Sequence, residues 1–153
     1  MISAGQTAPD FTLPRDGGAT ITLSALRPGK VVIYFYPKDD TPGCTLEAQD
    51  FNARLAEFTA AGATVIGISK DSVKSHDKFC KKHGLSIVLA SDETGTTCED
   101  YGVWLEKSMY GKTYMGIERT TVLIDGTGQV ARVWNKVSVK GHADEVLAAV
   151  KAL

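Results

Sequence analysis

The sequence predicts an α/β domain of three layers, in which a central mixed β-sheet is flanked by helices and preceded by an N-terminal β-hairpin. Short β-branched and aromatic runs, typical of strands buried on both faces, alternate with segments whose apolar residues recur every three or four positions. An Asp-Gly turn between the last two predicted strands indicates that part of the sheet is antiparallel. No repeat, linker or low-complexity tract divides the 153 residues, so we expect residues 1–153 to form a single domain.

The first half of the chain contains a hairpin, two strands and a helix. The apolar runs "APDFTL" and "GGATITL" are separated by a Gly-rich turn, which predicts the hairpin. "VVIYFYP", residues 31–37, and "ATVIGIS", residues 63–69, predict two buried strands. Between them, apolar side chains fall at helical spacing from Thr45 onward, and Gly62 can end that helix. The apolar positions of this helix are Ala48, Phe51, Leu55 and Phe58.

The second half begins with a helix over residues 70–84, for which Asp71 or Ser72 is the N-cap and Gly84 the end. The elements expected after it are a strand at 85–91, a short helix at 94–101, an irregular or hairpin segment at 103–118, a pair of strands within 119–134 and an amphipathic helix at 141–153.

Composition excludes several classes of function. With 17 basic and 18 acidic residues the net charge is −1, so we expect neither nucleic acid nor a membrane surface as partner. The N-terminus lacks the pattern of a targeting signal, and the three cysteines are odd in number and widely spaced, which favours the reducing cytoplasm. No CxxC pair or metal-ligand spacing occurs, and we expect His76, His83 and His142 on helix surfaces.

Cys44 lies in the most informative stretch, "YFYPKDDTPGCTLEAQDF". A strand ended by Pro37 and a helix beginning near Pro42 place this thiol in the first helical turn, where free backbone N–H groups favour a thiolate. A free cysteine is about 3% ionised at neutral pH, so ionisation adds at most ~30-fold in rate. Larger gains need donors such as the Thr41 hydroxyl, the N–H groups after Gly43 and a guanidinium. The alternative is a buried, inert thiol.

The motif "TPGC", with Pro37 shortly before it, resembles the active-site loop of the peroxiredoxins. The resemblance covers nearly the whole chain, and its most specific stretches are "YFYPKDDTPGCTLEA" and "YGVWLEKSMYGKTYMGIERTT". These two stretches are similar to the bacterioferritin comigratory protein group, also called peroxiredoxin Q. The resemblance implies a thioredoxin-like fold and the reduction of peroxides by a cysteine thiolate.

Carried over to this sequence, the resemblance implies that Cys44 is the peroxidatic nucleophile and that Arg119 holds its thiolate and binds a peroxide oxygen. It implies that Thr41 hydrogen-bonds both sulfur and peroxide, and that Pro37 and Pro42 form the pocket walls. Gly43 has no side chain, so its residue type alone predicts a close approach of the backbone. Glu47, one turn past the cysteine, either orients the arginine or is an ordinary helix-surface acid.

A sulfenic acid on Cys44 must be resolved by a second thiol before it is oxidised further. Some members of the group carry that thiol at the position of Gln49, so that route is closed here. The resemblance assigns the role to Cys80, whose alternative is core packing. A disulfide requires Cα atoms within roughly 7 Å, and a thiol on a neighbouring helix should not reach Cys44 in the reduced fold. We therefore expect the helix segments that carry Cys44 and Cys80 to unfold locally. Cys98 has no motif around it and is expected to be a packing residue, with a backup resolving role as the minority alternative.

The resemblance therefore implies a monomeric thiol peroxidase without a bound cofactor, which reduces hydrogen peroxide and organic hydroperoxides and is recycled by thioredoxin or a similar dithiol. Three alternatives stay open at this point: a one-cysteine peroxidase that uses an external thiol, a thiol-disulfide oxidoreductase, and a non-catalytic thioredoxin-like binding module.

Overall fold

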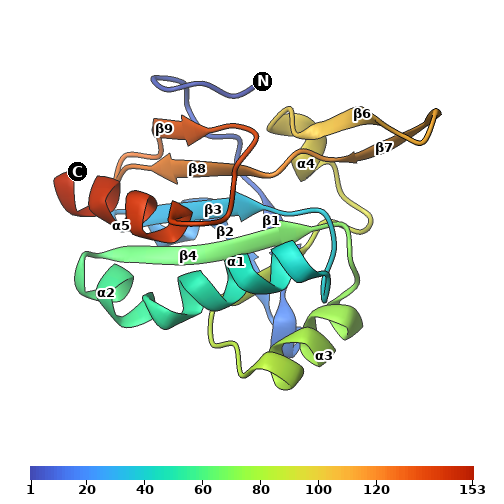
Figure 1. The fold of residues 1–153 in the computed structure, drawn as a ribbon. Coiled ribbons are helices and arrows are strands. Elements are labelled where there is room, and N and C mark those ends of the chain that lie inside the picture. The colour runs from blue at the N-terminus through green and yellow to red at the C-terminus, as the bar shows by residue number, and fades with distance from the viewer.

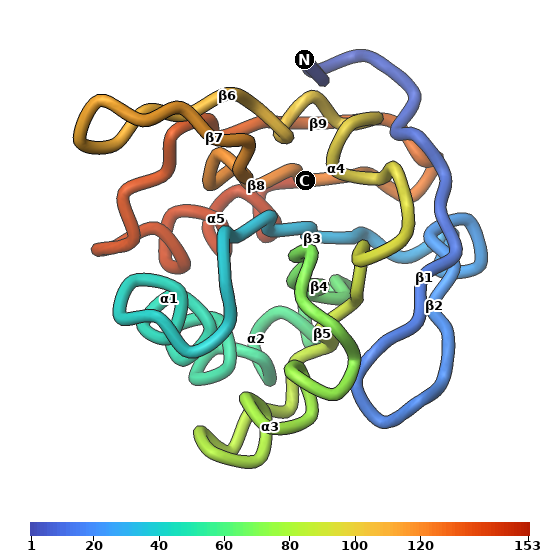
Figure 2. Tube along the Cα trace, turned by 90° about the vertical axis from the view of Figure 1, so that its right-hand side faces the viewer, coloured from blue at the N-terminus to red at the C-terminus, as the bar shows by residue number.

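The computed structural model describes residues 1–153 and has the three-layer architecture that the sequence predicts (Figures 1 and 2). The five-stranded central sheet has the order β5-β4-β3-β8-β9. Strands β3, β4 and β5 are parallel, whereas β8 runs antiparallel to β3 and to β9, so the sheet is mixed. The strand bounds are β3 Lys30–Phe35, β4 Ala63–Ser69, β5 Val88–Ser91, β8 Thr120–Ile124 and β9 Val130–Trp134.

Different elements cover the two faces of this sheet (Figure 2). One face packs against the helices α1 Pro42–Ala53, α2 Leu55–Ala60, α3 Val73–His83 and α5 His142–Ala152. The other face packs against the N-terminal segment, the hairpin β1 Thr12–Pro14 with β2 Thr20–Thr22, the short 3-10 turn Leu23–Leu26, and α4 Thr97–Asp100. A second 3-10 turn, Asp16–Gly18, lies against α3 and β5. Each face therefore has its own apolar core.

Most of the helices and strands predicted from the sequence are confirmed, and the segment 103–118, predicted as irregular or hairpin, is a hairpin. The helix over 70–84 begins after Ser72, whose hydroxyl accepts the Ser75 backbone N–H, and it ends at Gly84 with a left-handed φ of 62°. The segment 103–118 is a hairpin of β6 Trp104–Met109 and β7 Lys112–Ile117, which projects beyond the rest of the molecule in Figure 1.

Two predictions on this chain are wrong. The apolar periodicity from Thr45 predicts one helix, but the chain breaks into α1 and α2 at Arg54, which has non-helical dihedrals of −107° and 8°. His76 and His142 were expected on helix surfaces and are buried, because each has a polar partner in the interior: Asp39 for the first and Thr121 for the second.

The topology brings distant segments to one edge of the sheet. The carboxyl end of β3 lies beside the amino end of β8, since Phe35 pairs with Thr120. The loop that leads from β3 into α1 and the residue that precedes β8 are therefore neighbours in space. No helix is long and apolar enough to span a membrane, and no group of three or more His, Cys, Asp or Glu side chains is close enough to hold a metal ion.

Candidate active site

Cys44 lies in the first turn of α1, with its side chain almost fully buried at 2% exposure. Pro42 is the first helical residue, where its missing N–H is no loss. Thr41 precedes the helix in an extended conformation, and its carbonyl accepts the N–H of Thr45 at 2.8 Å. The sulfur is thus held at the positive end of the helix, as the sequence predicts.

Arg119 reaches this sulfur from the residue before β8. Its Nη2 donates to Cys44 Sγ at 3.4 Å, and its Nη1 donates to Glu47 Oε1 at 2.6 Å. A Cβ at position 43 would lie 3.2 Å from Nη2, a tight contact that would push the guanidinium back by a few tenths of an ångström. Gly43 therefore leaves room for the guanidinium beside the thiol. The forked geometry allows one cation to contact both partners at once.

Glu47 is 1% exposed, so the alternative of a helix-surface acid is wrong. Burial raises the pKa of Glu47 from 4.5 to about 7, although the Arg119 guanidinium opposes that rise. Its Oε2 atom has no hydrogen-bond partner. The only hydrogen-bond partner of this buried side chain is the Arg119 guanidinium.

The remaining residues that the sequence singles out lie on the segment that leads into Cys44. Pro37 and Pro42 are exposed on the segment that carries the cysteine. The Thr41 hydroxyl donates to the Lys38 carbonyl at 2.9 Å, so its hydrogen is engaged while its lone pairs are free to accept. Its hydrogen bond to Cys44 and to a peroxide stays a prediction.

The comparisons with known proteins agree with this geometry. The model of the AhpC/TSA family matches residues 4–133. The chain belongs to the AhpC/TSA family. It is 54% identical over 143 residues to peroxiredoxin Bcp of Xanthomonas campestris, covering 94% of this chain and 89% of that one. It is 46% identical over 150 residues to peroxiredoxin Bcp of Bacillus subtilis, covering 98% and 96%. These relatives place it in the bacterioferritin comigratory protein, or peroxiredoxin Q, group and make it a thiol-dependent peroxidase.

Solved structures confirm the thioredoxin-like peroxiredoxin fold. Peroxiredoxin Q of Xanthomonas campestris, with one cysteine replaced by serine, superposes with a TM-score of 0.92 at 51% identity and covers 99% of both chains. A second structure of that protein, with a different cysteine replaced, gives a TM-score of 0.91. The two replaced cysteines are as far apart along that chain as Cys44 and Cys80 are along this one.

All three cysteines of this peroxiredoxin are free thiols, and they occupy different environments. Cys80, on α3, packs partly buried against the same apolar core that contains Cys44. Burial, with Asp16 and Asp39 nearby, raises the pKa of the Cys80 thiol from 9.0 to about 12. Cys98 is fully buried in the core on the opposite face of the sheet, and burial there raises its thiol pKa as well. The sheet therefore separates Cys98 from the other two thiols.

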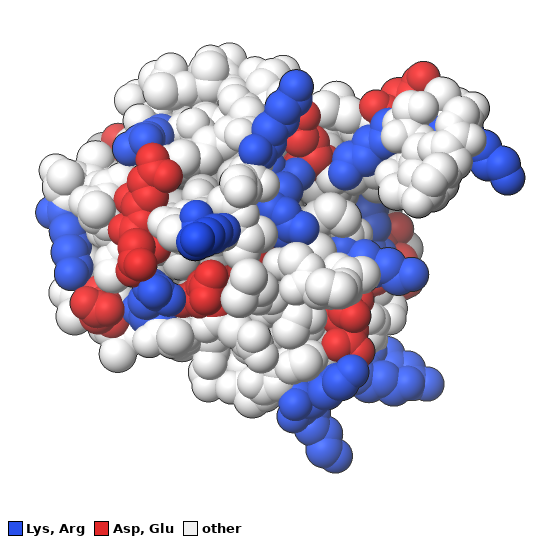
Figure 3. Space-filling model, in the orientation of Figure 1, with Lys and Arg blue, Asp and Glu red and all other residues white.

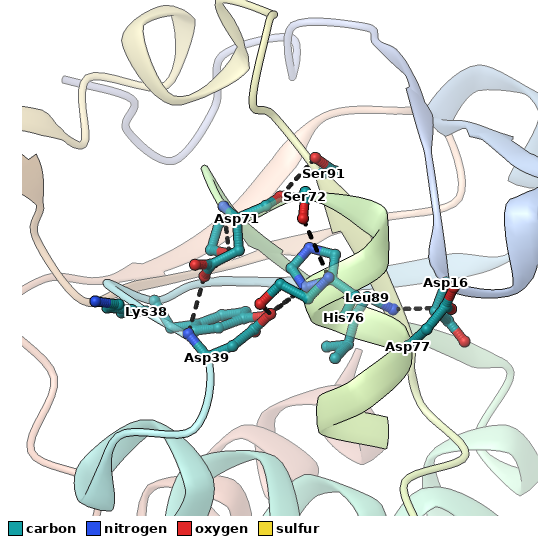
Figure 4. Close-up of polar contacts among 12 residues, drawn as sticks. Asp16, Lys38, Asp39, Asp71, Ser72, His76, Asp77, Leu89 and Ser91 are labelled. Atoms are coloured by element: carbon teal, nitrogen blue, oxygen red, sulfur yellow. Dashed lines mark hydrogen bonds and ion pairs between the residues drawn. The ribbon is translucent and has the colours of Figure 1, made fainter. Parts of the chain in front are cut away.

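Sequence reasoning missed a polar cluster beside the site, which Figure 4 shows. Asp39 lies in the loop between β3 and α1, and its carboxylate contacts His76 of α3 at 2.7 Å. Its backbone N–H donates to the Asp71 carboxylate at 2.9 Å. The signals available were an acid directly after a buried strand and a histidine one turn before Cys80, but nothing in the sequence connects the two.

A groove of about 640 Å³ lies between α3 and the catalytic loop, residues 36–41, which joins β3 to α1. Asp39 and Asp40 form its loop side, while Lys78, Phe79 and Lys82 form its helix side. In Figure 3 lysine and arginine side chains gather over α3 at the lower right. One side of this helix is thus open to solvent next to the loop that leads into Cys44.

Proposed function

We propose that this peroxiredoxin reduces hydrogen peroxide and organic hydroperoxides with Cys44 as the nucleophile. The observation that carries the proposal is the Arg119 side chain, which donates both to the Cys44 sulfur and to the buried Glu47. Held by that acid, the guanidinium stays fixed where negative charge develops when the O–O bond breaks. One solved relative is described by its alkyl peroxide reduction activity, which supports the inclusion of organic hydroperoxides.

The first step oxidises the sulfur by two electrons. The Cys44 thiolate attacks one peroxide oxygen, the O–O bond breaks, and the departing oxygen takes up a proton and leaves as water or an alcohol. The product on the enzyme is a sulfenic acid. Thr41 accepts a hydrogen bond from the peroxide, Arg119 stabilises the departing oxygen, and Pro37 and Pro42 limit access of bulk water.

In the second step Cys80 condenses with the Cys44 sulfenic acid, forming a disulfide and releasing water. Two observations support Cys80 rather than Cys98: it lies on the same face of the sheet as Cys44, and its spacing matches the pair of cysteines replaced in the solved relative.

The folded environment keeps Cys80 from reacting early. With its pKa near 12, its thiolate fraction at neutral pH is roughly a thousandfold below that of an exposed thiol. Local unfolding of α3 and of the start of α1 thus brings the thiols together and also restores the ionisation of the attacking sulfur.

The cycle closes when thioredoxin or a similar dithiol reduces the disulfide by thiol-disulfide exchange, with no bound cofactor. We place the enzyme in the cytoplasm, where such dithiols are kept reduced, and propose that it acts as a monomer.

The test is peroxide consumption in the presence of thioredoxin, its reductase and NADPH, for wild type, Cys44→Ser and Cys80→Ser. We expect both variants to lose turnover and the oxidised wild type to contain a Cys44–Cys80 bridge. Turnover by Cys80→Ser would point to an external resolving thiol. A wild-type protein that reduces protein disulfides but not peroxide would contradict the proposal in favour of a thiol-disulfide oxidoreductase.

A further inference from the structure

The cluster missed from the sequence joins the two segments that must separate during the proposed cycle. Asp39 lies shortly before Cys44 in the catalytic loop, and His76 lies one turn before Cys80 on α3. The ring Nδ1 of His76 is 2.7 Å from Asp39 Oδ2, and both side chains are buried. Figure 4 shows this contact between the loop and the helix.

The hydrogen-bond pattern defines the charge of this pair. Asp39 accepts from the Tyr36 hydroxyl at 2.6 Å and from the Ser75 hydroxyl at 2.8 Å, which suits an ionised carboxylate. His76 faces an acceptor at each ring nitrogen, Asp39 at Nδ1 and the Ala90 carbonyl at 3.0 Å from Nε2. A neutral imidazole has one N–H and can donate to only one of these acceptors, so the geometry favours the doubly protonated ring.

We propose that the Asp39–His76 pair is a latch that holds α3 on the catalytic loop and sets how fast Cys80 is released to resolve oxidised Cys44. The proposal rests on the proposed function, because it concerns the second step of that cycle. His76 is a positioning residue, whose ring nitrogens have Asp39, Tyr36 and the Ala90 carbonyl as their polar partners. A buried, charge-assisted hydrogen bond is among the strongest single contacts that such a helix can lose on opening.

The latch also sets the outcome of a competition. While α3 stays closed, the Cys44 sulfenic acid remains available to a second peroxide, which would transfer another oxygen to the sulfur, give a sulfinic acid and leave as water or alcohol. Faster release of Cys80 favours the disulfide, and slower release favours the sulfinic acid. The strength of one ion pair therefore governs how much peroxide the enzyme survives.

The latch depends on pH with a defined sign. Burial lowers the pKa of His76, but Asp39, the Ala90 carbonyl and Asp71 together raise it above its ordinary value. The other titratable group that faces the ring is the Tyr36 phenol. Burial raises the pKa of this phenol well above its ordinary value. Because the folded-state pKa is raised, the stabilisation is complete below the unfolded-state value and is lost as pH rises through the folded-state value.

The experiment is a single turnover with one equivalent of hydrogen peroxide, in which mass spectrometry follows the conversion of Cys44 sulfenic acid to disulfide. His76→Gln keeps an amide donor for Ala90 but brings no charge to Asp39. We expect its disulfide to form about tenfold faster, the effect of one charge-assisted hydrogen bond, and its sulfinic acid yield in excess peroxide to fall correspondingly. An unchanged or slower rate would overturn the latch.

Two further readouts separate a latch from general destabilisation. The ratio of the His76→Gln rate to the wild-type rate should fall toward one as pH rises through the folded-state pKa of His76, which NMR titration of the ring gives. A ratio independent of pH would contradict the proposal. Ser75→Ala, which removes one neutral donor to Asp39, should accelerate disulfide formation by about threefold.

The control is Lys82→Ala, which removes an ion pair to Asp40 between the same loop and helix. That pair is exposed, at 62% for the lysine and 45% for the acid, so we expect a change of less than about twofold. If the wild type forms no Cys44–Cys80 disulfide, the proposed function fails. Hydrogen exchange over 73–83 would then still test the latch, with about tenfold faster exchange in His76→Gln and equal exchange as the contrary result.

Discussion

Replacement of Glu47 by glutamine should make this protein more stable and less active. The acid is buried, its Oε2 has no partner, and its pKa is raised from 4.5 to about 7. Such a rise means that the folded protein binds the proton more tightly than the unfolded chain does, so stability falls as pH rises from about 4.5 to about 7. The shift corresponds to about 3 kcal/mol of unfolding free energy.

Glutamine resembles the protonated acid at every pH. The unfolding free energy of Glu47→Gln should therefore exceed that of the wild type by little at pH near 4.5 and by up to about 3 kcal/mol above pH ~7. The assay is urea unfolding of the reduced protein at both ends of this pH range. The control variant is Glu57→Gln, because Glu57 is an exposed acid whose ion-pair partner is Lys151. Cys44 oxidation, followed by stopped flow, should slow because Arg119 loses its charged anchor. A stability difference that is the same at both pH values would refute the reasoning.

Three other expectations follow from the same contacts. Arg119→Met removes the donor to the sulfur, and we expect stopped-flow fluorescence to show Cys44 oxidation slowed by about 10²–10³-fold; a loss below tenfold would exclude a direct role for the guanidinium. With the pKa of Cys80 near 12 and that of Cys98 also raised by burial, iodoacetamide at neutral pH should label Cys44 first, and equal labelling of all three in the native protein would contradict this order. Burial lowers the pKa of His142 to about 4, so this neutral histidine should reduce wild-type stability as pH falls from ~6.5 toward 4, a loss that acid titration of His142→Gln should not show.

The fold was largely predictable because its signals are local. β3 and β4 are continuous apolar runs, and α3 has a serine cap and a terminal glycine within a few residues of its ends. The break between α1 and α2 was not predictable from apolar spacing, since the pattern continues across Arg54. A periodicity shows which face is buried and does not show whether the backbone along it is unbroken.

The site was predictable only where one segment carries it. The position of Cys44 in the first helical turn follows from the neighbouring prolines, whereas the contact with Arg119 depends on the antiparallel register of β3 with β8. His76 was placed wrongly because a histidine in a polar helix normally faces solvent. Its burial depends on Asp39, a partner from another element that no window around the helix contains.

The most direct test of the account is the order of oxidation events in the reduced wild-type protein. After one equivalent of hydrogen peroxide, quenching at successive times and peptide mapping should show a sulfenic acid on Cys44 alone, followed by its conversion to a Cys44–Cys80 disulfide while Cys98 remains a free thiol. First oxidation at Cys80 or Cys98, or a stable disulfide that excludes Cys44, would contradict the central claim.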